Sequence, residues 1–123
     1  MRAYRWIIAT CLLASQPAFA WSCRNEQFEI SCSGGRCEKA DSFTPMSVSL
    51  TERGRVSACA YTGCWEGRAQ ALKRSAKFLY ASGSFPFSSG GNKADLAITI
   101  DRRTGVATFI GGAGYAHPMI CTR

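Results

Sequence analysis

The chain has 123 residues, with 15 basic and 8 acidic side chains and a formal net charge of +7. Hydrophobic residues make up 46% of it, and it contains no linker-like stretch, no internal repeat of solenoid length and no low-complexity tail. These properties exclude a repeat protein and a largely disordered one, and they predict a single basic globular domain.

Residues 1–20 have the features of a secretory signal peptide. Two arginines, Arg2 and Arg5, precede a short apolar run, and Ala18-Phe19-Ala20 is a small-x-small cleavage sequence. The apolar run is much shorter than the ~20 residues that span a bilayer. We therefore expect cleavage after Ala20, a periplasmic or secreted location, no transmembrane segment after cleavage, and one domain over residues 21–123.

Removal of the leader would leave six cysteines, an even number that is typical of a disulfide framework in a small exported protein. A zinc site is the alternative, because two Cys-x4-Cys pairs could supply four thiolates, but an oxidising compartment favours disulfides. The Cys-x-x-Cys spacing typical of redox sites does not occur. We therefore expect no metal and no cofactor.

Hairpin geometry ranks the pairings of these cysteines. Two cysteine pairs each flank a four-residue connection that contains glycine. Directly opposed residues of a hairpin approach the Cα separation that a disulfide needs, so each connection predicts a local cross-link. The remaining two cysteines would then join the ends of the domain. The predicted disulfides are Cys32–Cys37, Cys59–Cys64 and Cys23–Cys121.

Alternation of polar and apolar residues predicts β-strands through most of the domain. Residues 51–54 and 101–105 have turn composition, so each predicts a hairpin. Pro118 in the last strand predicts an edge position for it. The predicted fold class is mainly β: a small single-domain antiparallel β-barrel or sandwich of about seven or eight strands, cross-linked by three disulfides. Strands are expected at residues 27–32, 46–50, 55–60, 96–100, 106–110 and 115–121.

Residues 68–80, RAQALKRSAKFLY, permit two interpretations. The segment is rich in helix formers, and Leu72, Ala76 and Leu79 fall at helical spacing, which fits a short helix. Two strands around Lys73-Arg74-Ser75 fit as well. We favour strands, because the flanking segments are predicted hairpins.

Charge gives the first functional indication. Without its leader the chain has 13 basic and 8 acidic side chains, a net charge of +5. A dense run of cations in residues 68–77 predicts a surface for an anionic partner, such as an envelope polymer, a lipid headgroup or an acidic protein. An ordinary solvated face is the alternative, and nucleic acid is not expected, because no recognition motif is present. The cluster is Arg68, Lys73, Arg74 and Lys77, and Arg102 with Arg103 forms a second pair on a different predicted loop.

Aromatic residues in predicted loops are further candidates for partner binding. Phe85 and Phe87 flank Pro86 in a glycine- and serine-rich segment, and Trp65 follows Cys64. Aromatic side chains in rigid loops suit recognition of a partner, so we include Phe85 and Phe87 in the predicted site. Capping of a barrel end is the alternative for the two phenylalanines, and packing on the disulfide is the alternative we favour for Trp65.

Catalytic residues are not assigned. The only histidine, His117, lies on the predicted last strand, where a structural role is more common than general acid–base catalysis. The sequence therefore predicts an exported non-enzymatic binding or interaction module of the bacterial envelope. A structural or stress-related exported protein and a small periplasmic hydrolase are the alternatives.

Overall fold

The structure, a computed structural model, describes residues 20–112 and 114–123. The predicted signal peptide therefore lies outside the described residues, except for Ala20. All regular elements in the described part are strands, and no helix occurs there. The strands are β1 (Ala20–Asn25), β2 (Ile30–Ser33), β3 (Arg36–Lys39), β4 (Met46–Thr51), β5 (Arg55–Ala60), β6 (Gly63–Arg68), β7 (Ala71–Arg74), β8 (Phe78–Phe85), β9 (Ala94–Asp101), β10 (Val106–Gly111) and β11 (Tyr115–Thr122).

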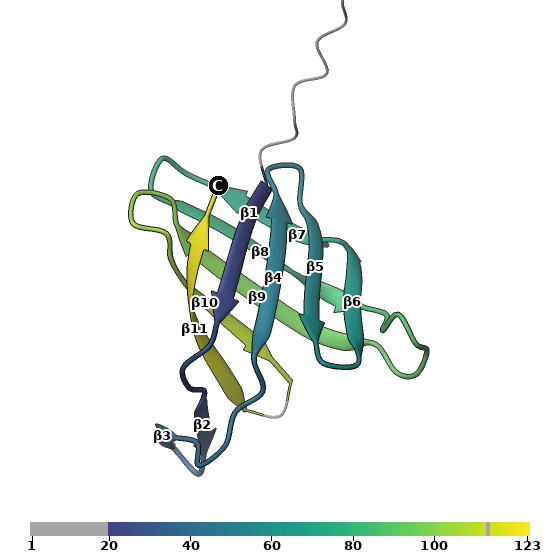
Figure 1. Ribbon diagram of the computed structural model, residues 1–123. Helices are drawn as coiled ribbons and strands as arrows, with labels where there is room; N and C mark the ends of the chain where they lie inside the picture. The colour runs from purple at the N-terminus through teal and green to yellow at the C-terminus, as the bar shows by residue number, and fades with distance from the viewer. Residues whose placement is uncertain (1–19, 113) are drawn as a thin grey trace, which may run out of the picture.

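One antiparallel sheet contains all of these strands. Its main order is β6-β5-β4-β1-β11-β10-β9-β8-β7, and the hairpin β2–β3 joins it through β11. The sheet curls into a half-barrel, in which β4, β5 and β6 face β7, β8 and β9 (Figure 1). The mainly β, antiparallel prediction is confirmed, with 11 strands because β1, β3 and β6 add to the predicted ones.

The core lies between the two facing halves of the sheet. Burial alternates along β1, β4, β9 and β10, so every second side chain of these strands points inward. Burying one such aliphatic or aromatic side chain stabilises the fold by about 1.5–3 kcal/mol. The largest fully buried side chains are those of Phe85, Phe109, Leu50, Leu79, Ile98, Ile100 and Val48.

All three predicted disulfides are present. Each joins residues that are directly opposed in the register of neighbouring strands. The disulfide between β1 and β11 closes a sequence separation of 98 residues, and the two local ones close separations of 5. The pairs are Cys23–Cys121, Cys32–Cys37 and Cys59–Cys64.

Residues 68–80 form strands rather than a helix, as we favoured. The β7–β8 turn is fixed by Ser75, whose Oγ accepts hydrogen bonds from the backbone N–H groups of Lys77 and Phe78 at 3.3 and 2.9 Å. β8 pairs with β9 along its whole length. The helix propensity of this segment is overridden, because strand pairing buries Leu79 and Ala81 in the core.

The edge position predicted for the last strand is wrong, because β11 lies between β1 and β10. The N–H of Cys121 donates to Gly105 at the β10 side, so alternation points the nitrogen of Pro118 away from β10. On that side β1 pairs only with residues 120–122 and β2 only with residues 115–116. Pro118 lies in the gap between these two partners, where no ladder hydrogen bond is lost.

Candidate functional site

Three turns and the C-terminus meet at the end of the half-barrel that lies uppermost in Figure 1. Nη1 of Arg74 donates to the carbonyl oxygen of Glu52 at 2.9 Å, which joins the β7–β8 hairpin to the β4–β5 turn. The backbone N–H of Arg102 donates to the carbonyl oxygen of Lys77 at 2.7 Å, which joins the β9–β10 turn to the same hairpin. Arg102 and Arg103, which we expected on a separate loop, therefore belong to the same surface as the predicted cluster.

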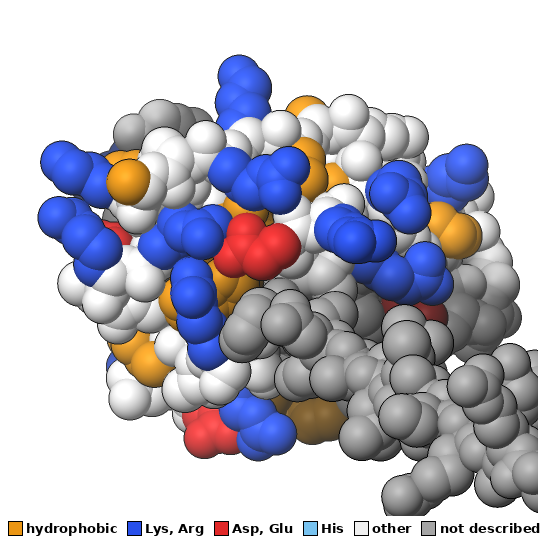
Figure 2. Space-filling model, turned by 90° about the horizontal axis from the view of Figure 1, so that it is seen from above, with side chains coloured by type: hydrophobic (Ala, Val, Ile, Leu, Met, Phe, Trp, Pro, Cys, Tyr) orange, Lys and Arg blue, Asp and Glu red, His pale blue; other side chains and the backbone are white. Residues whose placement is uncertain are grey.

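Basic residues concentrate at this end, which we call the basic end (Figure 2). Among residues 20–123 it carries nine cationic and three acidic side chains. The opposite end, which we call the far end, carries four cationic and five acidic side chains. The net positive charge of the domain therefore resides at the basic end. Its cations are Arg53, Arg55, Arg68, Lys73, Arg74, Lys77, Arg102, Arg103 and Arg123, and its acids are Glu52, Glu66 and Asp101. The far end carries Arg24, Arg36, Lys39 and Lys93 with Glu26, Glu29, Glu38, Asp41 and Asp95.

Glu52 organises the centre of the basic end. Its carboxylate accepts a hydrogen bond from Nη1 of Arg102 at 3.0 Å and lies 3.8 Å from Nη2 of Arg123. The guanidinium of Arg123 also lies over the ring of Trp21, 4.6 Å from its centroid. Sequence reasoning missed this role of Glu52, because its arginine partners are distant in the chain. One acid thus positions two guanidinium groups from different segments.

Asp101 is compensated within its own turn. It accepts a hydrogen bond from the backbone N–H of Arg103 at 2.9 Å, and this bond holds the pKa of the Asp101 carboxyl below its ordinary value. Further hydrogen bonds and the Arg103 guanidinium act in the same direction, against the opposing effect of desolvation. The carboxylate is therefore ionised at neutral pH, but its charge is matched by Arg103.

The members of the predicted cluster are all exposed. Arg68 ends β6, Lys73 and Arg74 end β7, and Lys77 lies in the following turn. Arg68 is directly opposed to Arg55 of β5 in the strand register. Like charges placed directly opposite each other destabilise a sheet, so this pair is a local cost to stability.

The aromatic candidates lie at the far end instead. The side chain of Phe85 is 1% exposed and packs over the bare backbone of Gly67 and Gly83. It offers a partner no contact area, and we leave it out of the candidate site. Its burial follows from the inward alternation of β8, a signal already present in the sequence.

Phe87 completes the closure of the half-barrel. Its ring lies 4.6 Å from that of Trp65, centroid to centroid, and the two residues form an isolated antiparallel bridge. Trp65 also packs against the core. This contact joins β6 to the segment that follows β8. Phe87 thus has the capping position that was the alternative to partner binding, and we leave it out of the candidate site.

His117 is buried at the far end. Its Nδ1 lies 3.5 Å from Oε2 of Glu29, and the two side chains are 8% and 12% exposed. Burial lowers the pKa of His117 from its ordinary value, and the nearby Glu29 carboxylate partly opposes this shift. Its ring lies 5.7 Å from that of Phe109, so the side chain is part of the packed interior.

Comparisons with known proteins add no functional information. No family model, no curated protein and no solved structure matches this chain. The described residues contain no group of three or more His, Cys, Asp or Glu side chains placed to hold a metal ion. A helix long and apolar enough to cross a membrane does not occur in the described part of the chain. The three disulfides indicate an oxidising compartment.

Proposed function

We propose that this chain is an exported, non-enzymatic binding module whose basic end recognises an anionic partner in the bacterial envelope. The observation that supports it best is the segregation of charge: nine cations gather at one end, and the far end has a slight acidic excess. Such an arrangement produces a strong positive potential at one end, which attracts and orients an anionic partner.

Arg55 and Arg68 support a binding role over a merely solvated face. Solubility requires charge, but it does not require two arginines directly opposed on neighbouring strands. Their repulsion lowers stability, and an anionic partner bound across both would relieve it. A structural or stress-related protein has no comparable use for this pair.

A small hydrolase has less support. His117, the only histidine, is 8% exposed, and its Nδ1 faces the carboxylate of Glu29 at 3.5 Å. General acid–base catalysis needs a group within hydrogen-bond reach of a substrate, and this pair is packed inside the far end.

The test compares two triple variants with equal loss of charge. Arg68→Gln/Lys73→Gln/Lys77→Gln removes three exposed cations from the basic end, and Arg36→Gln/Lys39→Gln/Lys93→Gln removes three exposed cations from the far end. Binding of the exported protein to dextran sulfate, a soluble polyanion, is measured at low and high salt. We expect the basic-end variant to lose about tenfold or more in affinity and the far-end variant about twofold or less.

Salt provides the second readout. The attraction should fade as the Debye length falls from about 10 Å at 0.1 M to about 3 Å at 1 M salt. Melting temperatures of both variants should stay close to that of the parent, because exposed substitutions usually change stability by about 0.5 kcal/mol or less. Equal losses of affinity in the two variants would show a basic protein without a site. If neither variant lost affinity, charge would not be the basis of recognition.

A further inference from the structure

Exposed apolar side chains adjoin the basic end. Among the described residues, six large hydrophobic side chains are exposed, and three of them lie near the turns that carry Lys77 and Arg103. We call these three the apolar corner. They are Phe78, Val106 and Ile120, which are 46%, 54% and 63% exposed.

Strand register places the apolar corner on one outward row. Phe78 begins β8 opposite Asp101, and Val106 begins β10 opposite Ile120. Ala107 pairs with Ile100, so Val106 lies beside Asp101 on the neighbouring strand. The acid within this row is the one that Arg103 compensates. Arg24 of β1, directly opposite Ile120, continues the row, although we counted it with the far end. The row therefore joins apolar side chains to one cation, and Arg103 matches the charge of its one acid.

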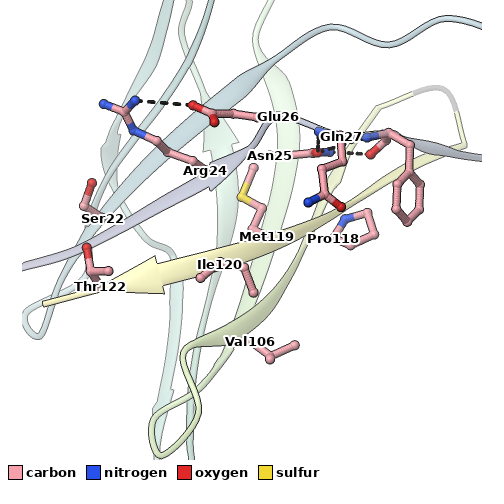
Figure 3. Close-up of a pocket in the computed structure, with 11 residues that line it drawn as sticks. Ser22, Arg24, Asn25, Glu26, Gln27, Val106, Pro118, Met119, Ile120 and Thr122 are labelled. Carbon is pink, nitrogen blue, oxygen red and sulfur yellow. Dashed lines mark hydrogen bonds and ion pairs between the residues drawn. The ribbon is translucent and has the colours of Figure 1, made fainter.

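The chain leaves part of this row uncovered. A groove of about 470 Å³ runs along the outer face of β1 and β11, and Val106, Pro118 and Ile120 contribute to its lining (Figure 3). Arg24 borders the same groove and pairs with Glu26 at 3.5 Å. The groove is on the outside of the half-barrel, so these apolar side chains face away from the core.

We infer that the anionic partner of the basic end is the surface of a lipid bilayer. This inference rests on the proposed function and narrows it to one partner. Lys and Arg side chains at a bilayer surface attract anionic headgroups. Apolar side chains beside them enter the boundary between headgroups and acyl chains. The apolar corner and the cations around it provide both contacts on one edge of the molecule.

A soluble polyanion would account for the cations of this surface but not for its exposed apolar side chains. Its charges would engage the cations, but it offers no apolar phase for Phe78, Val106 and Ile120. Apolar side chains grouped beside a charged surface are typical of protein or membrane contact sites. The density of cations around this group favours an anionic bilayer, because an apolar protein interface is depleted of charge at its centre.

The test uses a triple threonine variant of the apolar corner, Phe78→Thr/Val106→Thr/Ile120→Thr. Threonine retains strand propensity while removing most of the apolar surface. The matched control, Tyr61→Thr/Ile110→Thr/Tyr115→Thr, removes the other three large hydrophobic side chains that are exposed in the described part of the chain. Exported protein is mixed with vesicles of phosphatidylglycerol and phosphatidylcholine, with vesicles of phosphatidylcholine alone, and with dextran sulfate.

The expected pattern separates the two proposals. The corner variant should lose about tenfold or more in partitioning to phosphatidylglycerol vesicles while binding dextran sulfate like the parent. The control variant should resemble the parent in both assays. Parent protein that binds dextran sulfate but not the anionic vesicles would overturn the bilayer inference and retain the proposed function. Parent protein that binds neither would overturn both.

Fluorescence gives a direct readout of insertion. A tryptophan introduced as Phe78→Trp should show a blue-shifted emission on addition of phosphatidylglycerol vesicles, and one introduced as Tyr115→Trp should not. An unchanged spectrum for Phe78→Trp, or vesicle binding by the corner variant equal to that of the parent, would contradict insertion. Dimerisation of the parent that the corner substitutions abolish would identify the partner as a second copy of this chain instead.

Discussion

The two ends of the half-barrel are stabilised by different means. The far end carries both local disulfides and the contact between Trp65 and Phe87. The basic end has no local disulfide in the described residues, and its turns are joined by hydrogen bonds and ion pairs around Glu52. The two local disulfides are thus separated from the surface that concentrates charge.

This separation has an energetic reason. Nine cations at one end repel one another, and the opposed pair of Arg55 and Arg68 adds a local penalty. The far end supplies cross-links that constrain the unfolded chain without touching that surface. The stability of the fold and the charge of the basic end can then vary independently.

We expect the largest effect from removal of the disulfide between β1 and β11. The double variant Cys23→Ala/Cys121→Ala removes the disulfide that closes a separation of 98 residues, and it empties buried positions of β1 and β11. In the chain-entropy model the lost constraint corresponds to about 4–5 kcal/mol of unfolding free energy. We expect urea denaturation to show this loss, or a chain that no longer folds.

The local disulfide provides the contrast. Cys32→Ala/Cys37→Ala opens a separation of 5 residues, for which the same model gives about 2 kcal/mol. Binding of dextran sulfate by this variant should equal that of the parent, because the β2–β3 hairpin belongs to the far end. Equal destabilisation by the two double variants would contradict the chain-entropy account. Reduced binding in the hairpin variant would show that the two ends are coupled.

A smaller effect is expected within the basic end. Glu52→Gln removes the carboxylate that Arg102 and Arg123 contact, and an ion pair of this partly exposed kind contributes about 0.2–1 kcal/mol. The same change adds one positive charge to the basic end. We therefore expect slightly lower stability together with about two- to threefold tighter binding of dextran sulfate.

Glu38→Gln is the matched control, since it removes an exposed acid from the far end. It should leave dextran sulfate binding close to that of the parent. Weaker binding by Glu52→Gln would mean that the positions of Arg102 and Arg123 matter more than the added charge. Equal tightening by both variants would mean that only net charge matters.

The sequence was sufficient to predict those features that depend on residues close together in the chain. The turns at residues 51–54 and 101–105 and the two local disulfides follow from spacing and composition. At Gly105 the requirement is steric as well, because φ is 76° and a side chain there would collide with the carbonyl oxygen of Cys121. The Cys23–Cys121 disulfide followed by elimination once the local pairs were assigned.

Features that depend on the curling of the sheet were not predictable. Arg74 and Arg102 reach Glu52 across 22 and 50 residues of sequence, and no local pattern indicates that their turns meet. The central position of β11 depends on the gap between β1 and β2 that accommodates Pro118. For Phe85 a usable signal existed, because alternation from Leu79 places it on the inward face. Its loop-like neighbours, glycine, serine and proline, obscured that signal.

The smallest expected effect is a pH dependence that separates the two ends. Burial lowers the pKa of His117 in the folded protein below its ordinary value of 6.5, so the unfolded chain binds this proton more readily. Stability should be constant above about pH 7.5 and fall as the pH drops through about 6.5, by less than about 1.4 kcal/mol per pH unit. The fall should level off once the pH is below the folded-state pKa of His117. Chemical denaturation at a series of pH values measures this slope.

Two variants test the assignment to the far end. His117→Gln should abolish the slope near neutral pH whatever its effect on overall stability, because the titrating group is gone. Glu29→Gln removes the carboxylate that raises the pKa of His117, so the decline should extend to lower pH. At the basic end the lowered pKa of Asp101 implies stability that is present above about pH 3.8 and is lost as the pH falls further. If the unfolding free energy of His117→Gln still fell with pH near neutrality, the titrating group would lie elsewhere. The two ends would then not differ in their pH dependence as predicted.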